Sequence, residues 1–346
     1  MSTLTLVAVI IAIALIFDYI NGFHDAANSI ATIVATRVLT PFQAVLWAAF
    51  FNFAAAFIFG QKVAKTVGTG IVDLDLVTPY VLLAALSGAI VWDLITWWLG
   101  LPTSSSHALI GGLAGAGIAR VALLRGWSHW TDALNLGPDG QWPTTLKMII
   151  GAPLIGMASA YALMVIVYWM FRNSTPSKMD KYFRKLQLLS AAAFSLSHGS
   201  NDAQKTAGII TGVLFTAKQI PAFEVPYWVL MASYSAIALG TLSGGWRIVR
   251  TMGARLTRLK PRSGFCAETG AALAVFLSTH LGTPVSTTHA IAGAIAGVGS
   301  IQRMKAVRWG IATNIVWAWV MTIPAAALIA LASYYLLDYT VVPRSQ

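Results

Sequence analysis

The feature that most restricts the fold of this chain is a long stretch near its C-terminus that carries no charge. From Trp309 to Leu337, 29 consecutive residues include no Asp, Glu, Lys, Arg or His. A helix needs about 20 predominantly apolar residues to cross the core of a bilayer. The whole sequence is 57% apolar and 10% charged, whereas soluble domains are about 25% charged. The sequence therefore predicts an all-α polytopic membrane protein and argues against a soluble globular enzyme.

Apolar blocks of this kind recur along the chain between polar connections. The first block is not preceded by basic residues, which favours a retained helix over a cleavable signal peptide. We expect the longest blocks to be broken helices. The blocks lie near residues 4–39, 42–60, 80–99, 102–119, 147–171, 187–217, 226–246, 264–281, 284–301 and 309–337.

The positive charge of the chain is concentrated in a few connections. The net charge is +11, and in membrane proteins basic residues gather in cytoplasmic loops. Together with Arg37, the connections 172–185, 247–262 and 303–308 hold 15 basic residues and a single acid, Asp180. We therefore expect these connections to lie in the cytoplasm and both termini to lie outside it, across the cell's inner (plasma) membrane. This reading also makes a nucleic-acid partner unnecessary.

The same charge pattern predicts the topology. It holds only if 80–119 enters and leaves from the outside and 264–301 enters and leaves from the inside, so each should be a re-entrant helical hairpin. The first half then crosses the membrane an odd number of times, and a second half with the same plan begins on the opposite side. The prediction is two inverted repeats, 1–171 and 187–346, joined by a cytoplasmic linker at 172–186.

Matching motifs support this duplication. GLPTSSSHA at 100–108 matches GTPVSTTHA at 282–290, an offset of 182 residues. GFHDAAN at 22–28 matches GSNDAQK at 199–205, an offset of 177. Two motifs in the same order and at nearly the same spacing are hard to obtain by chance. Inverted repeats with interrupted apolar segments at corresponding places indicate a secondary transporter with its site near the bilayer midplane.

The first of these motifs, rich in Pro and hydroxyl residues, is typical of a helix start. In one interpretation the motif is an ordinary capped loop, in which the hydroxyls only cap free helix amides. At a hairpin tip inside the membrane, however, free amides are costly unless they line a cavity or bind something, and helix N-termini attract oxyanions. We therefore predict a tetrahedral oxyanion at the tips. The candidate hydroxyls belong to Ser104, Ser105, Ser106, Ser286, Thr287 and Thr288.

The second motif places an acid inside an apolar segment in each half. Asp25 and Asp202 each cost about 2.5–3.5 kcal/mol at the bilayer centre, so they need partners, either in a structural ion pair or in a wet functional site. Gly22 and Gly199 permit the helix to break there and free carbonyl oxygens. The candidates for cation or proton coupling are Asp25, Asn28, Asp202, His24 and Gln204, and those for the anion are Asn201 and Lys205.

The other ionisable residues in apolar segments have more than one possible interpretation. An imidazole at His24, beside Asp25, could carry a proton in the physiological range or serve as a hydrogen-bonding brace. His107 and His289 occupy equivalent places and are either polar core residues or substrate contacts. Acids without a symmetric counterpart are expected to be structural or interfacial: Asp18, Asp93 and Glu268.

At these residues the sequence resembles the inorganic phosphate transporter (PiT) family. FHDAAN at 23–28 is similar to the bacterial form of its first signature, and SHGSNDAQK at 197–205 is similar to the second. The resemblance spans nearly the whole chain and implies about 12 helical segments, a transport core beside a scaffold, and a homodimer. It also implies that phosphate lies between the hairpin tips. The residues that it assigns to phosphate or the coupling cation are Asp25, Asn28, Asn201 and Asp202.

The resemblance further implies a secondary active transporter that imports inorganic phosphate by cation symport, with alternating access, no cofactor, and H⁺ or Na⁺ as the coupling ion. Sodium-coupled relatives usually carry Asn where this chain has His24. The His form resembles bacterial members that move phosphate, or a metal–phosphate complex, with protons. A sulfate permease of the same architecture stays open, because both anions are tetrahedral, and so does a passive anion channel.

An intramembrane hydrolase is the alternative from a different class. Ser106 and Thr288 each precede a histidine, so a hydroxyl and an imidazole are adjacent in the sequence. Neighbouring residues on one helix point about 100° apart, and a nucleophile needs a base that a third group orients. We therefore expect no enzymatic activity.

Overall fold

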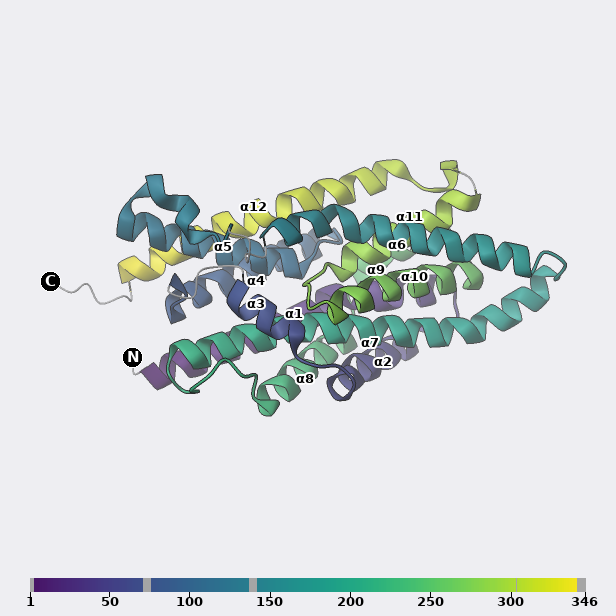
Figure 1. The fold of residues 1–346 in the computed structure, drawn as a ribbon. Coiled ribbons are helices and arrows are strands. Elements are labelled where there is room, and N and C mark those ends of the chain that lie inside the picture. Colours follow the sequence, from purple (N-terminus) through teal and green to yellow (C-terminus); the bar gives the residue numbers. More distant parts are fainter. Residues whose placement is uncertain (1–2, 71–75, 137–141, 303, 341–346) are drawn as a thin grey trace.

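The computed structural model describes residues 3–70, 76–136, 142–302 and 304–340, and every element in these ranges is helical (Figure 1). The long helices are α1 (Thr3–Ala35), α4 (Pro79–Leu99), α5 (Ser105–Arg125), α6 (Trp142–Met170), α7 (Pro176–Thr216), α10 (Pro261–His280) and α12 (Trp309–Thr340). The shorter elements are α2 (Pro41–Ala54), η1 (Ala55–Phe57), α3 (Lys62–Gly70), η3 (Trp127–Ala133), α8 (Tyr227–Ser243), α9 (Trp246–Arg250), η4 (Thr251–Arg255), α11 (Thr287–Gln302) and η5 (Met304–Ala306).

Several of these helices suit a bilayer. In the described part of the chain, α1, α4, α5, α6 and α12 are long and apolar enough to cross a membrane. The helices also follow the predicted apolar blocks closely. The all-α polytopic prediction is therefore confirmed.

The expected linker at 172–186 is largely helical. Pro176 occupies the first turn of α7, where its missing amide hydrogen costs nothing, and α7 then continues without interruption to Thr216. Charged residues keep a segment out of the hydrocarbon core but do not prevent a helix, so α7 extends past the apolar part of its sequence. Only the short turn between Met170 and Pro176 connects α6 to α7.

The predicted helix breaks at Gly22 and Gly199 are wrong, because α1 and α7 are continuous through both residues. Each glycine instead permits a close approach of two helices. A Cβ atom on Gly22 would collide with the backbone of Ile237 in α8, and one on Gly199 would lie 2.5 Å from the carbonyl oxygen of Asn52 in α2. The missing side chain therefore serves packing, as small residues do at helix interfaces in membranes.

The real breaks lie at the tips of two helical hairpins. The first hairpin consists of α4 and α5, the second of α10 and α11. Gly100 and Gly282 end the first helix of each with φ values of +68° and +73°, a left-handed conformation that glycine adopts at little cost. Figure 1 shows the hairpins entering from opposite ends of the molecule, with their tips near its middle.

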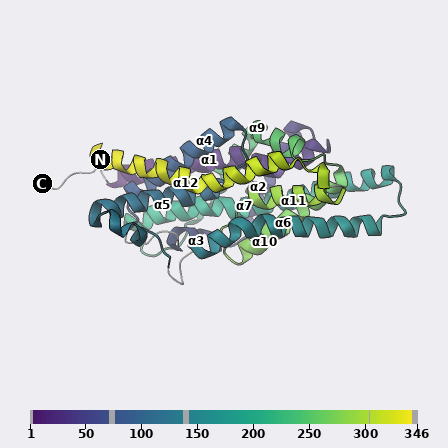
Figure 2. The same cartoon turned by 90° about the horizontal axis from the view of Figure 1, so that it is seen from above.

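The last long helix of each half packs on the hairpin of the other half. Helix α6 lies against α10 and α11, while α12 lies against α4 and α5 (Figures 1 and 2). The contacts are equivalent in the two places. Gly111 and Gly115 of α5 meet the α12 backbone, and Gly293 and Gly297 of α11 meet the α6 backbone. The two halves are thus interlocked rather than separate domains.

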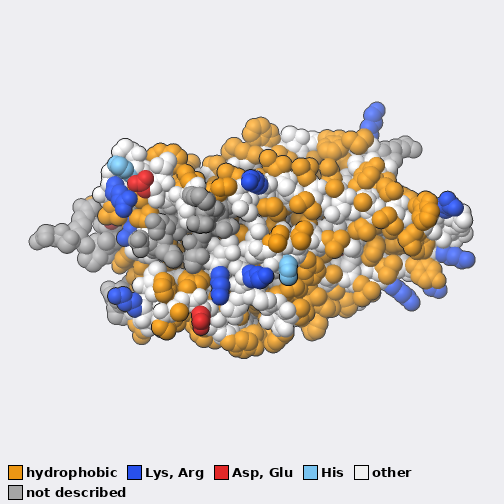
Figure 3. Space-filling view, in the orientation of Figure 1, with side chains coloured by type: hydrophobic (Ala, Val, Ile, Leu, Met, Phe, Trp, Pro, Cys, Tyr) orange, Lys and Arg blue, Asp and Glu red, His pale blue; other side chains and the backbone are white. Residues whose placement is uncertain are grey.

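Charge is distributed unevenly over the surface. In the face shown in Figure 3, Lys and Arg gather without acids at the end opposite the labelled termini, whereas the other end carries both signs and a broad hydrophobic surface lies between. Helix α1 begins and α12 ends at the end that carries both signs (Figure 1). Arg303 and the terminal residues 1–2 and 341–346 lie outside the described residues.

Candidate functional site

The first hydroxyl of each tip motif is a helix cap. The amide of His107 donates to Ser104 Oγ at 3.3 Å, and the amide of His289 donates to Ser286 Oγ at 3.2 Å. Both hydroxyls are buried and satisfy amides of the first turn of α5 or α11, as N-cap residues do. The structure therefore brings Ser104 and Ser286 to the tips but uses their oxygens locally.

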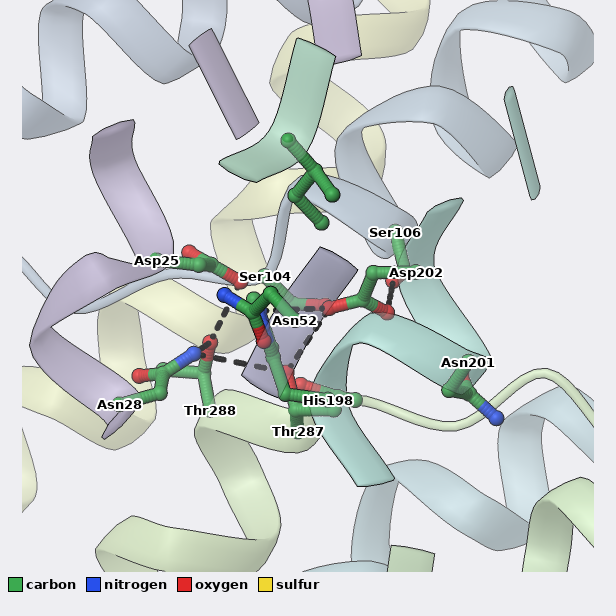
Figure 4. A network of polar contacts seen from close by, with 12 residues as sticks. Asp25, Asn28, Asn52, Ser104, Ser106, His198, Asn201, Asp202, Thr287 and Thr288 are labelled. Atoms are coloured by element: carbon green, nitrogen blue, oxygen red, sulfur yellow. Dashed lines mark hydrogen bonds and ion pairs between the residues drawn. The ribbon is translucent and has the colours of Figure 1, made fainter. Parts of the chain in front are cut away.

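The following hydroxyls reach the predicted acids. From α11, Thr288 Oγ1 donates to Asp25 Oδ2 at 3.2 Å, and Thr287 Oγ1 donates to Asp202 Oδ2 at 3.0 Å. The amide of Asn28 in α1 donates to Thr288 at 2.9 Å and to Thr287 at 3.4 Å. Figure 4 shows these side chains converging from α1, α7 and α11. One hairpin tip is thereby tied to both motif helices.

The first hairpin meets the same group from the other side. Ser106 Oγ donates to Asp202 Oδ1 at 3.5 Å and accepts a hydrogen bond from Lys205 Nζ at 2.5 Å. Lys205 also pairs with Asp202 and donates to the carbonyl oxygen of Val285 at 2.9 Å. Because Val285 belongs to the second hairpin, Lys205 touches both tips.

Each acid has an imidazole against it. His24 Nδ1 lies 2.7 Å from Asp25 Oδ1, and His198 Nε2 lies 3.1 Å from Asp202 Oδ2. His24 is braced on its other nitrogen by Thr96 at 3.1 Å. His198 did not appear among the predicted site residues, although it precedes Asp202 by four residues on α7 and so shares its face.

Two residues near these imidazoles were not predicted to belong to the site: Asn52 was not named, and Asp93 was expected to be structural or interfacial. Asn52 of α2 lies 3.2 Å from His198 Nδ1 and takes a place in the group in Figure 4. Asp93 is fully buried in α4, close enough to His24 to interact with it electrostatically. Neither residue lies in a repeated motif, so only the packing of α2 and α4 could reveal them.

Three predicted residues lie outside this centre. Asn201 points away from it and fixes the loop of the second hairpin, donating to Thr279 Oγ1 at 2.9 Å (Figure 4). Gln204 Oε1 accepts the amide of Val63 at 3.1 Å and so caps the start of α3. Ser105 is buried and faces Asp93, and its hydroxyl forms no hydrogen bond with any of the described residues.

The two tip histidines form a separate contact behind the tips. The rings of His107 and His289 are 4.7 Å apart, and His289 stacks on Trp319 of α12 at 3.9 Å. Ser106 is engaged with Lys205 and Asp202 rather than with its neighbour His107. Ser106 and His107 are therefore adjacent in the sequence without forming a nucleophile–base pair.

The acids do not form a ready metal site. Asp25, His198 and Asp202 each offer a ligand atom, and these atoms lie within 4.8 Å of one another. Lys205 already pairs with Asp202, however, so a divalent metal would have to displace an ammonium group. The residues fit a buried network of charges and hydrogen bonds better than a resident metal ion.

The acids and the lysine of the centre are buried, and the numbers of their acidic and basic groups differ. Asp25 is 3% exposed, Asp202 0% and Lys205 3%. With neutral imidazoles, the two carboxylates outnumber the single ammonium. Hydroxyl, amide and ammonium donors that could hold an oxyanion are present, but they currently serve these carboxylates.

The chain is similar in sequence to proteins of one family. A profile of the phosphate transporter family matches residues 21–330. A protein of Rhizobium meliloti named "probable low-affinity inorganic phosphate transporter" is 55% identical over 332 residues, which cover 95% of this chain and 96% of that protein. A protein of the same name from Bacillus subtilis is 41% identical, with 97% of this chain and 98% of that protein covered.

A solved structure has the same fold. It is described as "the sodium-dependent phosphate transporter" and matches with a TM-score of 0.86 and 25% sequence identity, covering 97% of this chain and all of that one. These relatives are named as transporters and not as enzymes. The matched residues span both acid motifs and both hairpin tips. The chain therefore belongs to the phosphate transporter family.

Proposed function

We propose that this protein imports inorganic phosphate by symport with protons. The observation that carries the proposal is the composition of the closed centre, in which two carboxyl groups, Asp25 and Asp202, accompany one ammonium group, Lys205. An oxyanion entering this centre adds to an existing excess of negative charge. Buried charge is tolerated only when it is compensated. Phosphate therefore has to arrive with positive charge, which is the physical basis of symport.

The donors for phosphate are those that now serve the acids. Ser106, Thr287 and Thr288 supply hydroxyls, and the starts of α5 and α11 supply amides and the positive ends of their helix dipoles. Lys205 supplies the one full positive charge. When the acids are neutralised, these donors are free to turn toward phosphate, so proton binding and anion binding favour each other.

The proton acceptors in this proposal are the imidazole–carboxylate pairs. His24 lies against Asp25 and His198 lies against Asp202. An unperturbed histidine is the side chain whose charge changes at about pH 5 to 8. Protonation of both pairs reverses the sign of the centre and makes it attractive to phosphate. A neutral metal–phosphate complex is the alternative form of the substrate, since its metal ion would bring the same compensation.

Alternating access follows from the way in which the tips are held. Thr287 and Thr288 tie the second hairpin to α1 and α7, and Ser106 ties the first hairpin to α7. Opening toward one side requires release of one tip while the other stays bound. We place the protein in the plasma membrane, with its basic end in the cytoplasm, and expect a homodimer.

The test is uptake of radiolabelled phosphate into proteoliposomes under imposed gradients. Acid outside should drive accumulation, a sodium gradient at equal pH should not, and excess sulfate should not compete. A chelator of divalent metals separates free phosphate from a metal complex. Accumulation driven by sodium alone would refute proton coupling, and equilibration without any gradient dependence would indicate a passive channel.

A further inference from the structure

A lysine outside the centre forms a hydrogen bond with the C-terminal end of the first helix of the second hairpin. Helix α10 ends at His280, and Lys62 Nζ, at the start of α3, donates to the His280 carbonyl oxygen at 3.1 Å. A Cβ atom on Gly282 would lie 3.3 Å from the Lys62 side chain. Thr66, four residues after the lysine, donates back to the Lys62 carbonyl at 3.2 Å.

An arginine makes the corresponding contact on the first hairpin. Arg247, in α9, donates to the carbonyl oxygen of Trp98 at 2.6 Å, and Gly100 follows two residues later. Thr251, four residues after the arginine, donates to the Arg247 carbonyl at 3.3 Å. Trp98 and His280 are separated by 182 residues, as are Gly100 and Gly282, which is the offset of the repeated tip motif. We call the two contacts the lysine clasp (Lys62 on His280) and the arginine clasp (Arg247 on Trp98).

Each clasp lines a pocket that is next to the motif helices. The lysine clasp lines a pocket of about 290 Å³ that includes Thr279, the partner of Asn201 in α7. The arginine clasp lines a pocket of about 330 Å³ together with Arg250 and Arg255. The segment before it touches α1, because a Cβ on Gly245 would lie 2.9 Å from the carbonyl oxygen of His24.

The clasps face different ends of the molecule. Figure 1 places α3, which begins at Lys62, nearer the end with the labelled termini, and α9 nearer the basic end. Each pocket therefore lies at the tip of a hairpin, on the side opposite to the one from which that hairpin enters.

Helix capping explains only part of this arrangement. A cation near a helix C-terminus satisfies a free carbonyl and the helix dipole. An ammonium has three N–H donors and a guanidinium has five. Lys62 and Arg247 each use one donor for a hydrogen bond to a hairpin carbonyl. No described acid forms an ion pair with Lys62, Arg247, Arg250 or Arg255. The Arg247 guanidinium also lies over the ring of Trp98, 4.2 Å from its centroid. N–H donors remain on both cations, and no described acid neutralises them, which suits an oxyanion.

We propose that the two pockets are docking sites for the phosphate oxyanion at opposite mouths of the transport path, with Lys62 at the outer mouth and Arg247 at the inner one. An anion that pairs with the clasp cation competes with the hairpin carbonyl for it. Arrival of phosphate therefore loosens the hairpin on the side from which it comes. This proposal rests on the proposed function.

The test compares transport in the two directions. In sealed membrane vesicles of each orientation, Lys62→Gln should raise the half-saturating phosphate concentration about tenfold for entry from the outer face, the effect of losing one hydrogen bond to a charged group. Entry from the inner face should change little. Arg247→Gln should show the opposite pattern. Lys62→Arg and Arg247→Lys keep the charge and should restore most of the affinity.

Matched controls remove an exposed charge elsewhere on the same side. Lys218→Gln and Lys178→Gln should leave both directions unchanged. Equal effects of a clasp variant in both directions would mean a structural cap and would overturn the proposal. Unchanged transport in both clasp variants would do the same.

A phospholipid headgroup offers the same phosphate chemistry as the free anion. If the effect of Arg247→Gln vanishes in vesicles made only of phosphatidylcholine, the inner pocket holds an anionic lipid and docking of free phosphate there is refuted. An effect that persists without anionic lipid supports the proposal. Wild-type protein that moves no phosphate in either orientation would instead refute the proposed function.

Discussion

At the scale of single residues, the centre depends on the two acids that tie helices α1 and α7 to the hairpin tips. Asp25→Asn or Asp202→Asn should reduce concentrative phosphate uptake by about 100-fold, the usual cost of breaking a buried, hydrogen-bonded charge pair. The variants should still reach the membrane folded. Asp132→Asn, which removes an exposed acid, is the matched control. Wild-type accumulation by either central variant would contradict the roles assigned here.

The hydroxyls next to these acids should differ in importance. Thr287→Ala and Ser106→Ala remove donors that reach Asp202, so each should raise the half-saturating phosphate concentration about tenfold. Ser105→Ala removes a hydroxyl of the same motif that has no partner in the centre, and its effect should be smaller. Initial rates over a range of phosphate concentrations measure all three. An equal effect at Ser105 would place the substrate elsewhere along the tip.

His24 provides a test of coupling at the same scale. His24→Asn removes the imidazole that lies 2.7 Å from Asp25. We expect uptake driven by a pH gradient to fall about tenfold or more, while exchange of phosphate across the membrane at equal pH continues. Counterflow of labelled phosphate measures the exchange. If the variant accumulates phosphate in response to acid as well as wild type does, the proton is carried elsewhere.

At the scale of helices, close packing takes the place of the predicted breaks. Helix α7 contains a useful pair of glycines: a Cβ on Gly199 would collide with the α2 backbone, whereas one on Gly212 would meet nothing within 4 Å. Gly199→Ala should destabilise the protein by about 1–3 kcal/mol through overpacking. Gly212→Ala should be neutral or stabilising, because alanine favours helix by about 1 kcal/mol. Thermal unfolding in detergent compares the two, and equal melting temperatures would contradict this packing.

The sequence predicts the helices and hairpins well because their signals are local. Apolar length, a glycine followed by proline, and a hydroxyl run mark each hairpin without knowledge of any neighbour. Helices α6 and α12 each pack on the hairpin of the other half. That packing depends on contacts between distant residues, such as Gly293 with Pro153, which local sequence patterns do not predict. The sequence analysis did not predict that 176–186 is helical. The charged residues of this segment indicate that it lies in water, but they do not indicate its backbone conformation.

The candidate site was predictable to the extent that it is repeated. Asp25 and Asp202 were found because each half carries one copy. The roles of Asn52 and His198 depend on which helices pack together, so the repeat does not reveal them. Gln204 lies in a motif but turns toward α3. Proximity in sequence to an acid does not fix the direction of a side chain on a helix.

At the scale of the whole molecule, two opposed hairpins meet at one closed and charged centre. The central claim is that a single oxyanion contacts both tips. It can be tested with Ser106→Cys and Thr288→Cys, each in a Cys266→Ala background that removes the one native thiol. The rate of modification by a small thiol reagent is then measured in proteoliposomes with and without phosphate. The account predicts that phosphate slows modification at both positions and that sulfate at the same concentration does not. Protection at one position alone, or at neither, would contradict it.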